Sequence, residues 1–191
     1  MNTLTHTLPE SELPLFLARE SLSLLLHSLL FLRAPGPVLP SSVACPNLAL
    51  SYSKIGRVED VDRQVAGAID SFLGALTPIG PELSKGVLSL SFFERRVSKA
   101  FLGLVSTEER VVWEAWSLPL LVNSTPRPVN EDGASVIERS RIQESTEATL
   151  RASLLHIHAC ASSISHVPPG EERENVYARV AQMPALINLT H

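Results

Sequence analysis

The chain has 191 residues, a length that suits one domain with room for a tail. Hydrophobic residues make up 45% of it and charged residues 19%, which suits an ordinary folded core and excludes a chain disordered by composition. Sixteen Lys and Arg against twenty Asp and Glu give a net charge of -4, so no basic stripe is available for phosphates and nucleic-acid binding is not expected. Two cysteines, Cys45 and Cys160, cannot form a disulfide framework and fit a reducing compartment.

Two helices and one strand are predicted in the first part of the chain. Apolar residues at spacings of three and four predict a long helix over residues 10–33, and Pro35 with the prolines after it ends this helix. Alternating apolar and small polar residues predict a half-buried strand over residues 43–55. A second helix is predicted over residues 58–76, with acidic residues in its first turn, where the helix dipole favours negative charge.

Two more strands and a third helix are predicted in the second part. The strands cover residues 87–97 and 111–122, and the segment between them, residues 98–110, is expected to be irregular and mobile. A long helix is predicted over residues 132–165, and its charged first half is expected to be solvated. Its second half, from Leu150 to Ile164, is nearly uncharged and is expected to be packed.

The order of these elements predicts an α+β fold in which three main helices pack on an antiparallel sheet. We expect residues 1–170 to form a single domain, and residues 171–191, which lack a strand signal, to form a C-terminal tail. The longest apolar run, Leu22–Leu32, is far shorter than the ~20 residues that span a bilayer. Acidic residues precede it where a signal peptide would be basic, so we expect a cytoplasmic chain without a transmembrane segment.

Residues that could carry catalysis or bind a metal are sparse. The sequence has no phosphate-binding glycine loop, no Cys-x-x-Cys pair and no His-Glu-x-x-His motif. His156 and Cys160 share one face of the predicted helix while His158 points elsewhere, so one ion could recruit only two of these ligands. We therefore expect no enzyme, no metal and no cofactor, with a zinc site on His156 and Cys160 as a minor alternative.

Two apolar features stand out. The segment Trp113-Glu-Ala-Trp116 places both tryptophans of the chain in one strand, on opposite faces by alternation. We interpret these rings, with Phe92 of the neighbouring strand, as core residues of a strand that is covered on both sides. The second feature is an apolar tip within a polar stretch, which either binds a partner, as exposed apolar tips often do, or folds back onto the sheet. It consists of Phe101, Leu102 and Leu104.

Three segments together resemble the autophagy-related protein 101 family, whose members are single HORMA domains. They are Leu22–Arg33, Leu88–Glu94 and Trp113–Trp116. The resemblance implies a non-enzymatic adaptor that pairs with and stabilises the HORMA domain of autophagy-related protein 13. It also implies membership of the autophagy-initiation kinase complex, a role in autophagosome formation, and localisation to the cytoplasm and the preautophagosomal structure.

The sequence departs from the family in two places. The family carries a Trp-Pro-Phe finger between the two central strands, thought to recruit downstream factors. The corresponding stretch here, Ser98–Leu104, has neither tryptophan nor proline, so Phe101, Leu102 and Leu104 form at best a degenerate finger. Family members also continue with further strands after the last long helix, whereas residues 171–191 have little strand character here. We therefore expect an incomplete sheet with an open edge that a partner strand could cover.

One further hypothesis stays open within the same fold class. HORMA domains in mitotic checkpoint, meiotic and DNA-repair complexes act as adaptors that clasp a peptide. Such a role needs a functional C-terminal belt, and the short tail argues against it.

Overall fold

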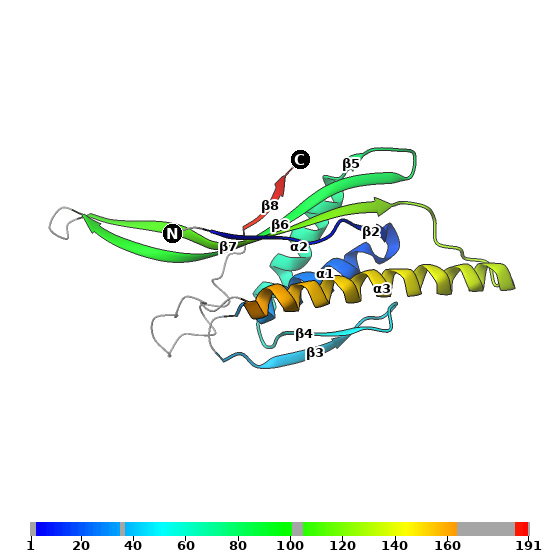
Figure 1. Ribbon diagram of the computed structural model, residues 1–191, viewed down its shortest axis with the longest axis horizontal. Coiled ribbons are helices and arrows are strands. Elements are labelled where there is room, and N and C mark those ends of the chain that lie inside the picture. The colour runs from blue at the N-terminus through cyan, green and yellow to red at the C-terminus, as the bar shows by residue number, and fades with distance from the viewer. Residues whose placement is uncertain (1–2, 35–36, 101–104, 164–185, 191) are drawn as a thin grey trace.

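The computed structural model describes residues 3–34, 37–100, 105–163 and 186–190 (Figure 1). Within them the chain forms three helices beside a mixed sheet, which confirms the predicted α+β class. The helices are α1 (Leu15–Leu32), α2 (Glu59–Gly74) and α3 (Gly133–Ser163). Helix α1 contacts both α2 and α3; in Figure 1, α1 and α3 run lengthwise below the sheet and α2 rises steeply across them.

The sheet is built around one long hairpin. Its strands β6 (Leu83–Ala100) and β7 (Val105–Asn123) pair antiparallel along their whole length. On the outer edge of β7, β1 (Leu4–Thr7) and β2 (Ser11–Pro14) run parallel to it, so the sheet is mixed rather than purely antiparallel. Four-residue strands are too short to give a periodic signal, and the sequence pattern therefore missed both of them.

The other edge of the sheet corrects the expectation for the tail. There β6 pairs with β5 (Thr77–Pro78) and with β8 (Leu186–Thr190), the latter opposite residues 87–91. The tail thus contributes a strand, and the edge that the sequence left open over residues 87–91 is covered. The rest of the predicted tail, residues 171–185 and 191, lies outside the described residues.

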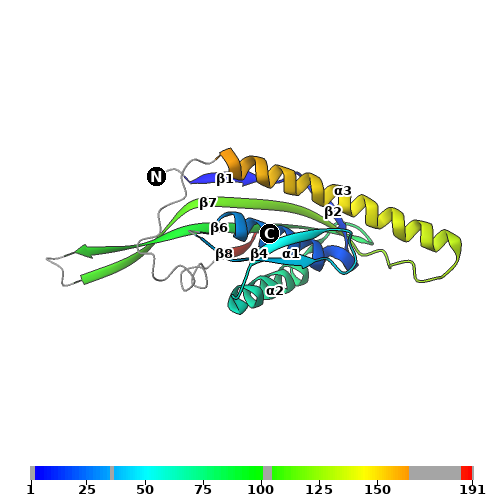
Figure 2. The same cartoon turned by 90° about the horizontal axis from the view of Figure 1, so that it is seen from below.

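The strands of the central hairpin also run through both ends of residues 98–110, the segment between the two predicted strands. Pairing continues from Glu94 opposite Val111 to Ala100 opposite Val105, so the prediction of an irregular segment over residues 98–110 is wrong for both strand ends. Cross-strand backbone hydrogen bonding specifies these residues as strand although their composition is polar. The hairpin therefore extends past the helices as a two-stranded arm (Figures 1 and 2).

Helix α1 is apolar on most of its surface because it is covered from several sides. It contacts β7 of the sheet, β4 (Ser51–Ile55) of a separate two-stranded sheet, and the neighbouring helices α2 and α3. Its length and composition alone would suit a membrane span, but 56% of the residues in that window are buried within the fold, as in a core helix. The helix begins at Leu15 rather than residue 10, because Ser11–Pro14 pair with β7 instead.

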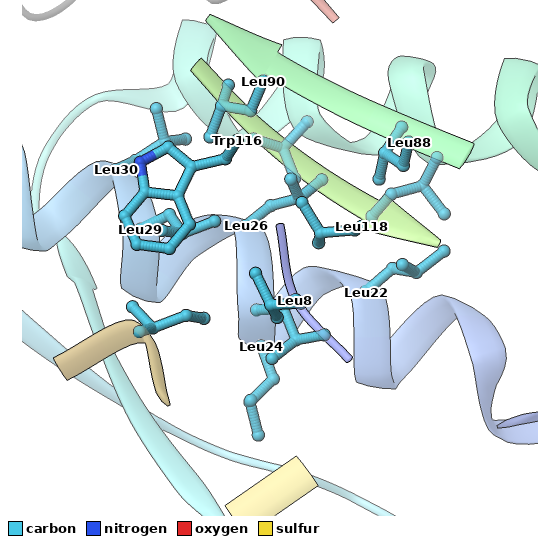
Figure 3. Packing of buried hydrophobic residues seen from close by; sticks show 14 of the residues in the cluster. Leu8, Leu22, Leu24, Leu26, Leu29, Leu30, Leu88, Leu90, Trp116 and Leu118 are labelled. Atoms are coloured by element: carbon cyan, nitrogen blue, oxygen red, sulfur yellow. The ribbon is translucent and has the colours of Figure 1, made fainter. Parts of the chain in front are cut away.

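Leucines of α1 meet the large side chains of the central strands. Figure 3 shows Trp116 beside Leu29 and Leu30 of α1, and Leu118 closer to Leu22. In the sheet, Leu90 lies opposite Trp116 and Leu88 opposite Leu118. All of these side chains are at most 7% exposed and belong to one hydrophobic cluster. This cluster is the core that joins the sheet to the helices.

Helix α2 confirms the predicted amphipathic helix and packs closely on β6. Its first turn carries the acidic residues Glu59, Asp60 and Asp62. A Cβ atom added at Gly86 of β6 would lie 2.8 Å from the Phe72 ring of α2 and 2.8 Å from the Leu76 side chain. Glycine at this position therefore lets the helix approach the strand.

A second, two-stranded sheet replaces the single strand predicted over residues 43–55. It consists of β3 (Pro40–Ala44) and β4 (Ser51–Ile55), which pair antiparallel across a turn. This β3–β4 hairpin lies on the far side of the helices from the main sheet (Figure 1). His27 of α1 packs against it: its ring stacks on Tyr52 of β4 at 5.9 Å, and Nε2 lies 3.8 Å from Asp62 Oδ1. Burial lowers the pKa of His27, and the Asp62 carboxylate opposes this effect in part.

Candidate partner-binding site

Helix α3 has one anchored side and one exposed side. On the anchored side, Leu150 is 1% exposed, Ser153 3% and Ile157 0%. Leu155, two residues after Ser153, lies on the other side of the helix and is 71% exposed. The expectation that the whole second half of α3 is packed is therefore right for only one of its sides.

The exposed side of this half carries no charged residue between Ala152 and Ser163. Four of its exposed residues follow helical spacings of three and four, and we call them the outer α3 face. They are Ala148, Ala152, Leu155 and Ala159. Three alanines around a leucine give a flat apolar surface that a second backbone can approach closely, and apolar surfaces of this kind mark protein contacts.

The β3–β4 hairpin is fixed to α1 and α3 by two carboxylates. Glu20 of α1 accepts hydrogen bonds from the backbone N and Nδ2 of Asn47, both at 3.0 Å. Glu147 of α3 accepts one from the Ala49 backbone N at 2.6 Å and pairs with Arg151 at 3.2 Å. The outer α3 face therefore belongs to a surface whose elements are held in fixed relation.

A buried polar centre lies where α1, β7 and α3 meet. Arg33, just after α1, donates from Nε to Glu114 Oε1 of β7 at 2.9 Å, and from Nη1 to the Ala161 carbonyl of α3 at 3.3 Å. The Trp116 indole donates to the same Glu114 oxygen. No pattern in the sequence predicted this centre, although a carboxylate between two tryptophans of a buried strand is the signal that could have indicated it.

The aromatic residues singled out from the sequence are buried in one cluster. Phe92 is 2% exposed, Trp113 6% and Trp116 1%. The prediction that the two tryptophans face opposite ways assumed an unbroken strand. A bulge at Phe92/Phe93 leaves Trp113 without a partner in the register, and its ring lies 5.8 Å from that of Phe92. The sheet face away from the helices carries small half-buried residues such as Ser89 and Ser117.

The remaining candidates give no site among the described residues. Phe101, Leu102 and Leu104 lie outside them. The Cys160 sulfur and His156 Nε2 are 3.5 Å apart, but the described part of the chain holds no cluster of three possible metal ligands. Burial, reinforced by the carboxylate of Glu20, raises the pKa of Cys45 to about 11, so this thiol stays protonated.

The three helices and the mixed sheet define an α+β protein of the HORMA-like class. Comparison with known proteins identifies the family within this class. The sequence model of the family described as autophagy-related protein 101 matches residues 13–174. Autophagy-related protein 101 of Arabidopsis thaliana is 27% identical over 180 residues, which cover 88% of this chain and 81% of the relative. The chain belongs to the autophagy-related protein 101 family.

Family membership confirms the resemblance found in the sequence and has two direct consequences. The family is a non-catalytic adaptor family, which agrees with the prediction that the chain is no enzyme. Its role lies in the autophagy-initiation complex, and it is consistent with a cytoplasmic site of autophagy.

Proposed function

We propose that this chain is an adaptor of autophagy initiation that pairs with the HORMA domain of autophagy-related protein 13 and stabilises it. The observation that carries the proposal is the outer α3 face, an apolar surface on the longest helix of the fold with Leu155 71% exposed at its centre and the ion-paired Arg151 at its edge. Residues 1–170, together with the tail strand β8, act as one domain in this pairing, at the preautophagosomal structure in the cytoplasm, and the pair helps to assemble the initiation kinase complex.

The outer α3 face can supply the anchor of such an interface but not all of it. Burying most of one leucine side chain contributes roughly 1–2 kcal/mol. A stable interface buries about 800 Å² on each partner, so the partner must also cover surface beside α3. The β3–β4 hairpin adjoins α3 and exposes small residues that a partner can approach. They are Ser42, Ala44, Ser51 and Ser53.

A second contact is proposed at the far end of the molecule. Phe101, Leu102 and Leu104 take the position of the family's finger, between the two strands of the arm that end at Ala100 and Val105. Without the tryptophan and proline of the family, this tip offers less apolar surface to a downstream factor. We propose that it serves as a reduced recruitment contact that is independent of the pairing.

Leu155→Glu tests the pairing, because it places a charge at the centre of the outer α3 face. The expected result is a loss of affinity for the HORMA domain of autophagy-related protein 13 by a factor of about 10–100, measured by isothermal titration calorimetry. Ile137→Glu is the matched control, since Ile137 is 70% exposed on the same helix but lies about 27 Å away along its axis. Equal affinity of both variants and the unmodified chain would contradict the proposed surface.

A further inference from the structure

The Arg33–Glu114 pair joins three elements that are distant in sequence. The side chains are 4% and 0% exposed, and the guanidinium reaches both the Glu114 carboxylate of β7 and the Ala161 carbonyl of α3. Ala161 lies in the last turn of α3, where backbone carbonyls lack partners within the helix. Arg33 thus caps the C-terminal end of α3, and its positive charge suits the negative end of the helix dipole.

Stability alone does not account for this pair. Arg33 Nη2 and Glu114 Oε2 are buried and have no hydrogen-bond partner in the part of the chain that the structure describes. A buried ion pair with unused donors and acceptors gains little over well-packed apolar side chains, because the desolvation of both charges offsets their attraction. What such a pair supplies is a specific geometry.

The geometry that Arg33 fixes is the position of the last turns of α3. Ile157 is the last fully buried residue of the helix, and Cys160 packs partly against the core. Beyond it, Arg33 Nη1 donates a hydrogen bond to the Ala161 carbonyl at 3.3 Å. On the exposed side of the helix, Ala159 of the outer α3 face lies at the start of these turns and Leu155 lies one turn before it.

We propose that Arg33 is a positioning residue for partner binding: by capping α3 at Ala161 it holds the outer α3 face in the orientation that the partner meets. This inference rests on the proposed function. The Glu114 carboxylate orients the guanidinium, and the Trp116 indole in turn holds the carboxylate. Arg33 touches no partner itself, since it is buried beneath the surface that it positions.

The test replaces the pair by uncharged side chains of similar size. In Arg33→Met/Glu114→Gln the amide oxygen still accepts from the Trp116 indole, so the fold is expected to keep its melting temperature within about 3 °C. Amide hydrogen exchange of residues 158–163 in the free chain is expected to become about tenfold faster, with residues 146–154 unchanged. Affinity for the HORMA domain of autophagy-related protein 13 is expected to fall about tenfold, because the partner must order these turns on binding.

Arg19→Met is the matched control, since this arginine of α1 pairs with Asp70 at the surface, with 59% of its side chain exposed. It should leave unchanged both the hydrogen exchange of residues 158–163 and the affinity for the partner. Unchanged exchange over residues 158–163, or unchanged affinity, in the folded double variant would overturn the inference.

Two further results are distinguished from a failure of this inference: a double variant that does not fold, and an unmodified chain that does not bind the partner. If the double variant does not fold, Arg33→Lys keeps the charge beside Glu114 but lacks the fork that reaches both acceptors, and the same exchange and affinity shifts are then expected of it. If the unmodified chain does not bind the partner, the proposed function fails, and with it the role of Arg33 in binding. The exchange measurement then still decides whether Arg33 holds the end of α3.

Discussion

Truncation of Ile157 in α3 should lower the stability of the fold, whereas truncation of Leu155, two positions away, should weaken partner binding. Ile157 is 0% exposed and Leu155 is 71% exposed. Ile157→Ala removes three buried carbon atoms, worth about 2.4 kcal/mol at ~0.8 kcal/mol each, and the cavity left behind brings the loss of unfolding free energy to roughly 3 kcal/mol. At about 2–4 °C per kcal/mol for a chain of this size, the melting temperature should fall by roughly 6–12 °C.

Leu155→Ala should change stability by less than about 0.5 kcal/mol, since alanine is at least as good a helix former and little buried contact is lost. It should instead weaken partner binding. Urea unfolding followed by tryptophan fluorescence measures the first effect, because Trp113 and Trp116 are both buried. Similar losses of stability in the two variants would refute the assignment of an anchored and an exposed side of α3.

Three further predictions concern the rest of the fold. Gly86→Ala places a methyl group 2.8 Å from the Phe72 ring, and this overpacking should cost about 1–3 kcal/mol in urea unfolding. The pKa of His27 is lower in the fold than in the unfolded chain, so its contribution to stability is fully present above the unfolded value of about 6.5 and is lost as the pH falls through the folded pKa. His27→Gln should therefore flatten the dependence of melting temperature on pH below about 6.5, and an unchanged slope would contradict this. Iodoacetamide at pH 8 should label Cys160 well before Cys45, whose buried thiol has a pKa of about 11, as peptide mass spectrometry can show. Faster labelling of Cys45 would show that the thiol is not buried.

The sequence was sufficient for the elements whose periodicity is long. Helices α1 and α2 repeat their apolar residues over several turns, and the strands around Leu88 and Trp116 alternate clearly, so these elements and the α+β class could be predicted. The short strands could not, because β1, β2 and β8 have four or five residues each and are defined by their pairing with β7 and β6. Their place in the sheet follows from contacts between residues that are far apart in the chain.

The β3–β4 hairpin and the candidate partner-binding site likewise depend on contacts between residues that are far apart in the chain. The turn between β3 and β4 depends on Glu20 and Glu147, which lie 27 and 98 residues from the backbone groups that they bind. The Arg33 contact with Ala161 spans 128 residues. Charged residues of this kind resemble ordinary surface residues in a linear pattern, and only the fold shows which of them are buried and what they bind. The exposed position of Leu155 was missed because a uniformly uncharged helix segment does not reveal which side is packed.

The most direct test of the central claim is the mass of the complex. The purified full chain and the HORMA domain of autophagy-related protein 13 are mixed at micromolar concentration and separated by size-exclusion chromatography with light scattering. We predict a single peak with the mass of a 1:1 pair, and loss of that peak with Leu155→Glu. Two separate folded monomers of the unmodified proteins would contradict it and would show that this family member does not form the proposed pair.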